Sequence, residues 1–243
     1  MKCILILGAT SDIAISLAMK FAEQNYSLIL AGRSIQDLDS LKSDISIRYE
    51  VPVWIHEFNA CSFSDHNNFF SKLECVPDTT ICVFGYLGDQ IQAQSNWNES
   101  KKILDTNLIG AISILNIVSE KYEHQGKGSI VGISSVAGER GRQSNYIYGA
   151  SKAGFTAYLS GLRNRLFKSN IHVLTVKPGF VATKMTEGLN LPKALTANPD
   201  QVALSILKGL KKKKNNIYIL PVWRLIMFII RTIPEMIFKR MDL

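Results

Sequence analysis

The sequence predicts a single-domain α/β protein built on a doubly wound parallel sheet. Three observations predict it. Short, continuously apolar runs such as Lys2–Leu7 suit parallel strands that are buried on both faces. These runs alternate with longer amphipathic segments across short loops. Glycine, serine and asparagine follow most of the apolar runs, at the strand ends where open α/β sheets bind their ligands.

The expected elements follow in chain order. The expected strands are Lys2–Leu7, Tyr26–Ala31, Val53–Phe58, Thr80–Phe84, Ser129–Ile133, His172–Val176 and Asn216–Leu220. The expected helices run from Asp12 to Asn25, Ser34–Tyr49, Phe63–Leu73, Trp97–Tyr122, Asn145–Phe167 and Pro199–Lys208. This alternation predicts one domain over residues 1–220, followed by a tail over residues 221–243.

Composition excludes several classes of function. The 243 residues are 47% hydrophobic and 20% charged, which is enough apolar material for a large core and argues against disorder. The four cysteines and four histidines lack metal-ligand spacing, so no metal site is expected. Of the net charge of +8, residues 207–243 carry +7 (nine Lys/Arg against two Asp/Glu), which leaves the main domain nearly neutral and argues against nucleic-acid binding. We expect reduced thiols and a cytoplasmic location.

One stretch carries a proton-transfer pattern. Tyr148 and Lys152 are four residues apart in an expected helix, so their side chains share one face. Ser135 follows the strand that ends at Ile133. A neighbouring ammonium would lower the pKa of the phenol, whose ordinary value is ~10. The alternative is an ordinary helix face, because a Tyr and a Lys at this spacing are common by chance.

The first strand-to-helix turn is a candidate phosphate site. Gly8 would allow a tight turn, and the amides from Thr10 and Ser11 to Ile13 would bind an anion. Only one of the usual three glycines is present, and Asp12 stands where the second would be. A carboxylate there would repel a pyrophosphate unless its side chain turns away. The alternative is a simple strand-to-helix turn.

The next two strand ends suggest which dinucleotide is bound. Arg33 follows the second strand, where an acidic residue would bind a ribose 2′-hydroxyl, and a guanidinium suits a 2′-phosphate. NADP(H) is therefore preferred over NAD(H). Asn59 and Ala60 follow the third strand and could contact the adenine, although a turn explains the asparagine nearly as well.

Together these residues resemble the short-chain dehydrogenase/reductase family, whose fold is Rossmann-type, over the chain to about residue 220. The family's catalytic Asn, Ser, Tyr and Lys match Asn107, Ser135, Tyr148 and Lys152. The segment Pro178-Gly179-Phe180-Val181-Ala182-Thr183 matches its nicotinamide-side loop, where Val181 and Thr183 would contact the cofactor. The usual Asn-Asn-Ala-Gly after the fourth strand is replaced by Phe84-Gly85-Tyr86-Leu87-Gly88.

The resemblance implies a role for each residue. Tyr148 would donate a proton to the oxygen of a carbonyl that receives hydride from NADPH, and Ser135 would hold that oxygen. Lys152 would lower the pKa of Tyr148 and hold the nicotinamide ribose, while Asn107 would anchor a water that links Lys152 to solvent. The family also implies a homodimer or homotetramer. The alternative class, a non-catalytic NADP sensor, would be expected to lack Tyr148 or Lys152.

Some details resemble a narrower group within the family. The segments from Gly8 and from Gly85, with the basic tail, resemble the reductases of polyprenyl-phosphate-linked keto-sugars, such as decaprenylphosphoryl-2-keto-ribose reductase. Arg140, Arg142 and Gln143 are candidate contacts for a phosphate or sugar, or else solvated loop residues. The competing substrates are 3-oxoacyl chains, steroids and other lipid carbonyls.

The tail has two interpretations. Arg224 and Arg231 would lie on one side of a helix whose other side is apolar, which is typical of a helix in a membrane interface. Its apolar run is too short to span a membrane, and Pro234 is expected to break it. The protein would then sit at the inner face of the membrane and take a lipid-linked carbonyl substrate. Alternatively, the tail folds over the substrate site or a subunit interface.

Overall fold

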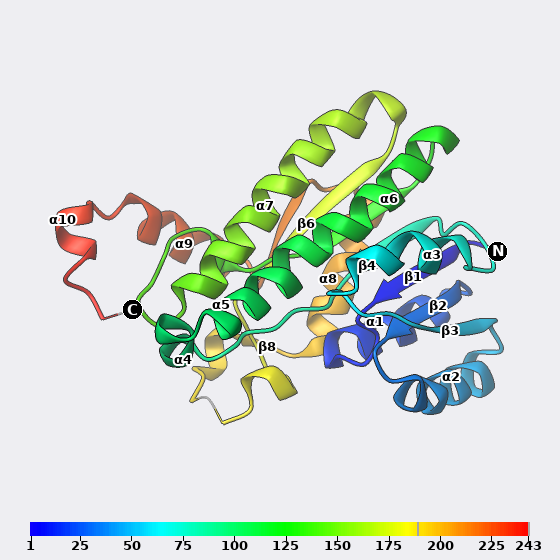
Figure 1. The fold of residues 1–243 in the computed structure, drawn as a ribbon, viewed down its shortest axis with the longest axis horizontal. Helices are drawn as coiled ribbons and strands as arrows, with labels where there is room; N and C mark the ends of the chain where they lie inside the picture. The colour runs from blue at the N-terminus through cyan, green and yellow to red at the C-terminus, as the bar shows by residue number, and fades with distance from the viewer. Residues whose placement is uncertain (189, 243) are drawn as a thin grey trace.

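The computed structural model describes residues 1–188 and 190–242 and confirms the doubly wound sheet (Figure 1). Seven parallel strands are arranged in the order β3-β2-β1-β4-β5-β6-β9. The strands are β1 (Cys3–Leu7), β2 (Ser27–Gly32), β3 (Val53–Glu57), β4 (Thr79–Cys82), β5 (Ser129–Ile133), β6 (His172–Pro178) and β9 (Asn216–Ile219). The order reverses between β1 and β4, and a doubly wound sheet binds its ligand at that point.

Helices cover both faces because each strand is apolar on both sides. From β1, Ile4 and Ile6 point into the core on one face, while Leu5 and Leu7 point into the core on the other. The first face is covered by α1 (Asp12–Ala22), α2 (Ile35–Tyr49) and α8 (Pro199–Lys211). The second is covered by α3 (His66–Ser71), α6 (Gly110–Gln125) and α7 (Tyr146–Leu166).

The long helix expected from Trp97 to Tyr122 is interrupted. It consists of α5 (Trp97–Leu104), a π-helical turn η2 (Asp105–Ile109) and α6, and a short helix α4 (Gln90–Ser95) precedes it. The stretch Trp97–Gln125 is long and apolar enough to cross a membrane, but it packs along the sheet as a core helix. π-Helical turns are frequent at functional sites, and this one contains Asn107.

Two short strands beyond β6 were not expected from the sequence. β7 (Phe180–Val181) pairs with β8 (Thr196–Ala197) in a separate parallel sheet. The connection between them includes Thr183, Met185 and Thr186, and it lies over the carboxyl end of the main sheet (Figure 1).

The tail packs against the body through one face. It forms α9 (Val222–Thr232) and α10 (Glu235–Phe238), with the expected break at Pro234. Trp223 and Met227 are buried against Val136, just beyond β5, and Trp223 lines a cavity at the carboxyl end of the sheet, so one face of the tail packs against the body. The lysines 211–214 lie at the amino end of β9, whereas the tail leaves its carboxyl end, so the strand separates the two basic segments.

Candidate active site

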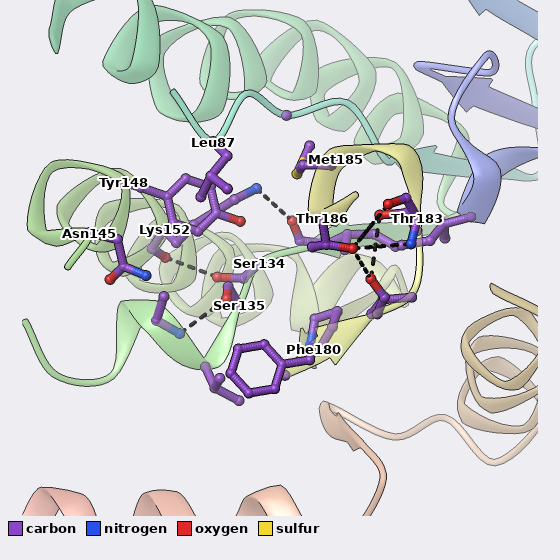
Figure 2. A pocket seen from close by; sticks show the side chains of 18 of the residues that line it. Leu87, Ser134, Ser135, Asn145, Tyr148, Lys152, Phe180, Thr183, Met185 and Thr186 are labelled. Atoms are coloured by element: carbon purple, nitrogen blue, oxygen red, sulfur yellow. Dashed lines mark hydrogen bonds between the residues drawn. The ribbon is translucent and has the colours of Figure 1, made fainter. Parts of the chain in front are cut away.

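Ser135, Tyr148 and Lys152 line one cavity of about 190 Å³ at the carboxyl end of the sheet. Ser135 lies just beyond β5, while Tyr148 and Lys152 lie in the first two turns of α7. Figure 2 shows these three side chains on one side of the pocket, with Met185 and Thr186 opposite. The Ser135 Oγ accepts a hydrogen bond of 3.1 Å from the N–H of Ala137, which fixes its rotamer and leaves its own proton free to be donated.

Burial controls the ionisation of Tyr148. It raises the pKa of the phenol to about 12, and a hydrogen bond with Ser135 opposes the rise only in part. The expectation that Lys152 makes Tyr148 more acidic is therefore wrong for the protein alone. The loss of contact with water is the dominant cause of the rise, while Lys152, whose Nζ is 5.7 Å from the ring centroid, donates its hydrogen bond to the carbonyl of Ile133. Tyr148 thus carries its proton at neutral pH, as a proton donor must.

Lys152 is held as a buried cation. Its side chain is 3% exposed, and Nζ donates a hydrogen bond of 3.1 Å to the carbonyl of Ile133. Burial lowers the pKa of the ammonium to about 8. A charge this costly to bury is typical of a functional site.

The side chain of Asn107 is fully engaged by the backbone. Its Nδ2 donates to the carbonyls of Tyr86 and Ile103, and its Oδ1 accepts from the N–H of Tyr86 at 2.9 Å. These bonds hold the segment after β4 against α5. The relay role of Asn107 stays a prediction.

The residues predicted to bind the cofactor line two adjoining cavities. The second cavity, of about 410 Å³, shares Val83, Gly85 and Met185 with the first. Predicted residues in the second cavity are Gly8, Thr10, Ser11, Arg33, Asn59, Ala60 and Gly85. Those in the first are Ile13, Gly85, Tyr148, Lys152, Pro178, Gly179, Val181 and Thr183. The two cavities form one cleft from Arg33 to Tyr148.

This cleft fits a dinucleotide with an extra phosphate. Gly8 has φ +87°, and a Cβ there would lie 2.7 Å from the backbone nitrogen of Phe84, so the turn requires glycine. The first N–H groups of α1 have no partner within the helix and suit an anion. Arg33 and Lys102 both line the second cavity, and none of the described residues lining it is acidic.

Asp12 does not line either cavity. Its carboxylate turns away and accepts a hydrogen bond of 2.8 Å from the N–H of Lys184. The carboxylate therefore supports the segment after β7 and is not a direct cofactor contact. This direction reduces the repulsion of a pyrophosphate that the carboxylate would cause, and the binding of a phosphate by the N–H of Asp12 at the start of α1 stays a prediction.

A family model described as short chain dehydrogenase matches residues 2–194. The chain belongs to the short-chain dehydrogenase family. An oxidoreductase of Mycobacterium tuberculosis is 31% identical over 98% of this chain and 96% of its own length. Carbonyl reductase family member 4 of Xenopus laevis is 25% identical over 85% and 89% of the two chains. This short-chain dehydrogenase is accordingly an oxidoreductase.

The fold is shared with solved members of the family. The structure of a short-chain dehydrogenase from Sphingobium yanoikuyae in complex with NADPH superimposes with a TM-score of 0.83 at 20% identity, over 97% of each chain.

Sequence reasoning missed several residues that line the cleft of this short-chain dehydrogenase. Lys102 of α5 has its Nζ 4.2 Å from the ring centroid of Tyr86, and as one of two adjacent lysines in an expected helix it gave no signal in the sequence. Met185 and Thr186 depend on the unexpected β7–β8 pair. Trp223 of the tail could have been suspected from its aromatic character, but the sequence does not show that it reaches the pocket.

Proposed function

We propose that this protein is an NADP(H)-dependent reductase that converts a carbonyl to an alcohol. The observation that carries the proposal is the single cleft that joins Tyr148, Ser135 and Lys152 to a cavity lined by Arg33. The NADPH in the Sphingobium yanoikuyae structure and the name of the Xenopus laevis relative support the same cofactor and substrate class.

The chain's own residues perform the acid chemistry. When bound, NADPH supplies the hydride. Tyr148 donates the proton of its phenol to the carbonyl oxygen as negative charge develops there, and its high pKa keeps that proton available across neutral pH. The Ser135 hydroxyl donates a second hydrogen bond to the same oxygen. Lys152 supplies a nearby positive charge and would hold the nicotinamide ribose.

The test is NADPH oxidation over a panel of ketones and aldehydes. Tyr148→Phe removes the proton donor and should lower the rate by about 10²- to 10⁴-fold. Tyr146→Phe is the matched control, because Tyr146 lies on the same helix, is 43% exposed and does not line the pocket. It should stay within about twofold of the wild type. Equal rates for Tyr148→Phe and the wild type would show that Tyr148 is not the acid.

For the substrate we favour a polyprenyl-phosphate-linked keto-sugar, with 3-oxoacyl, steroid or other lipid carbonyls as the alternative. Apolar side chains of Leu87, Phe180, Met185 and Trp223 line much of the pocket, which suits a substrate with an apolar part. Comparing kcat/KM between a prenyl-phosphate keto-sugar and a 3-oxoacyl thioester separates the two.

We propose that the outer face of α9 rests on an anionic membrane surface, from the cytoplasmic side. Leu225, Phe228 and Ile229 are 61%, 67% and 52% exposed, and Arg224 and Arg231 lie beside Leu225 and Phe228 along one surface groove. Leu225→Ser with Phe228→Ser should abolish sedimentation with anionic liposomes. Binding that is unchanged in this variant contradicts the membrane contact and leaves a protein partner or a second copy as the occupant.

The family resemblance also supports a homodimer or homotetramer. Light scattering coupled to size-exclusion chromatography measures the mass directly, and a mass near the 27.1 kDa of one chain would contradict this part of the proposal.

A further inference from the structure

Three of the polar side chains between Ser135 and Tyr148, those of Arg140, Arg142 and Gln143, have different surroundings in the structure. Arg140 binds the tail, because its Nη1 donates to the carbonyls of Ile230 and Ile233 at 2.6 Å each. Gln143 also binds the tail, because its Nε2 donates to the Asp242 carboxylate at 3.0 Å. Arg142 instead lines the reaction pocket, and its Nε is buried without a hydrogen-bond partner among residues 1–188 and 190–242.

The side chain of Arg142 is half-buried at the edge of the pocket. Its Nε is buried, and burial lowers the pKa of the guanidinium below its usual value of 12.5, although an arginine still carries its charge at neutral pH. Buried charges in folded proteins are normally paired. The nearest acid in the sequence, Glu139, is already bonded by Lys177 at 2.7 Å and by Tyr218 at 2.5 Å.

Two of the buried polar atoms without a protein partner, Arg142 Nε and Asn145 Oδ1, belong to residues that line the reaction pocket. Among the described residues there are four such side-chain atoms, namely Gln90 Nε2, Glu139 Oε2, Arg142 Nε and Asn145 Oδ1. Three belong to the segment 139–145, and Gln90 is fixed next to Tyr148 by accepting from the N–H of Ile147 at 3.1 Å. Asn145 lines the same pocket as Arg142 (Figure 2). Native folds leave few such atoms, so the two that belong to residues of this pocket favour a ligand that completes the bonding there.

We propose that Arg142 binds an anionic group, a carboxylate or a phosphate, carried by the carbonyl substrate. The proposal rests on the proposed reductase function and narrows its substrate class. A planar guanidinium offers paired donors that match both kinds of anion. Asn145 lines the same pocket, and its side-chain amide would hydrogen-bond a hydroxyl on the same substrate. With Leu87, Phe180 and Trp223 on the pocket walls, the substrate is an acidic amphiphile with a carbonyl.

Matched substrates test this specificity. The panel contains a long-chain keto acid with its methyl ester, and a keto-alkyl phosphate with its free alcohol. Arg142→Gln should raise KM for the acidic members by about 10- to 100-fold, because a hydrogen bond to a charged group is lost, and should leave KM for the neutral members within about threefold. A larger rise in KM for the keto acid identifies the anion as a carboxylate, and a larger rise for the keto-alkyl phosphate identifies it as a phosphate. The KM of Arg142→Lys for the acidic members should fall between the values for the wild type and for Arg142→Gln. Arg165→Gln, an exposed arginine in the last turn of α7 and outside the reaction pocket, removes the same charge and should change the KM for neither the acidic nor the neutral members.

A binding measurement separates this proposal from the proposed function. Calorimetric titration with decanoate and with decyl phosphate needs no turnover. If either anion binds more tightly to the wild type than to Arg142→Gln, the anion site is supported. If the wild type at the same time reduces none of the carbonyls in the panel, the reductase function is overturned and the anion site remains. Equal affinity of both proteins for both anions, or an equal loss on acidic and neutral substrates, would overturn the anion site.

Discussion

The carboxylate of Asp12, in the first turn of α1, accepts a hydrogen bond of 2.8 Å from the backbone N–H of Lys184, which is 172 residues away. This bond ties the phosphate-side turn to the segment that covers the reaction pocket. It also explains how an acidic residue is tolerated beside an expected pyrophosphate, since the oxygen atoms are directed to another donor.

The bond predicts a different effect for each of two substitutions of Asp12. Asp12→Asn keeps the acceptor and removes a charge that repels phosphate, so it should lower the Kd for NADPH about two- to fivefold. Asp12→Ala also loses the bond, so trypsin should cleave faster after Lys184 and Lys193. NADPH titration and timed proteolysis measure these effects, with Asp37→Asn in the first turn of α2 as the control. Slower or unchanged cleavage of Asp12→Ala would show that the hydrogen bond between Asp12 and Lys184 does not hold this segment in place.

Arg33 should decide between NADPH and NADH. It is exposed, and only Lys102 joins it as a cation among the described residues that line the second cavity. Arg33→Ala should raise the Kd for NADPH about 10- to 100-fold, since a charge-assisted bond to the 2′-phosphate is lost, and leave the Kd for NADH within about threefold. Fluorescence titration with both nucleotides measures the difference. Arg48→Ala, at the far end of α2, is the control, and an equal loss for both nucleotides would contradict 2′-phosphate recognition.

The buried charge of Lys152 should lower the free energy of unfolding while it supports the reaction. Its pKa is about 8 in the folded protein against 10.5 ordinarily, so the unfolded chain holds the proton more strongly. The resulting destabilisation is fully present below pH ~8 and disappears as the pH rises through ~10.5. Lys152→Met should therefore raise the free energy of unfolding by about 1–3 kcal/mol at pH 7, with little gain near pH 10.5, while reductase activity is lost.

Urea unfolding at pH 7, 8.5 and 10 measures this dependence. Lys121→Met, at an exposed position of α6, is the matched control and should shift the free energy by no more than about 0.5 kcal/mol. A Lys152→Met variant that is less stable than the wild type at pH 7 would show that the bond to Ile133 outweighs the cost of burying the charge.

Local signals predicted the sheet and the core of the site. Parallel strands such as β1 are buried on both faces, so their apolar runs mark them without knowledge of their neighbours. Tyr148 and Lys152 share one helix, so their proximity is also local. The sequence therefore predicted the catalytic stretch before any tertiary contact was known.

The features that were missed depend on contacts between distant segments. The β7–β8 pair joins residues 180–181 to 196–197, and the π-helical turn leaves no pattern in the apolar spacing of the long helix. The direction of the Asp12 carboxylate depends on Lys184, and the net effect on the Tyr148 pKa depends on burial that the spacing of the motif does not report. The division of labour between Arg140 and Arg142 depends on where the tail lies.

Arg140 should control how firmly the tail covers the pocket. The last carbonyls of α9 lack helical partners, and Arg140 caps those of Ile230 and Ile233 while its guanidinium lies 3.7 Å from the ring centroid of Phe238. Arg140→Gln should raise hydrogen exchange in residues 222–238 about 10- to 30-fold, which corresponds to a loss of ~2 kcal/mol. It should also raise KM for apolar carbonyls, because Trp223 lines the pocket.

Two further variants isolate the cause. Glu235→Gln removes only the ion pair between Arg140 and Glu235, whose side chain is 77% exposed, so it should leave exchange nearly unchanged. Gly179→Ala displaces the tail from the other side, because its Cβ would lie 1.9 Å from the Trp223 ring. It should reproduce the rise in exchange with Arg140 intact. If both Arg140→Gln and Gly179→Ala loosen α9 while KM for apolar carbonyls stays constant, the tail is not a wall of the substrate site.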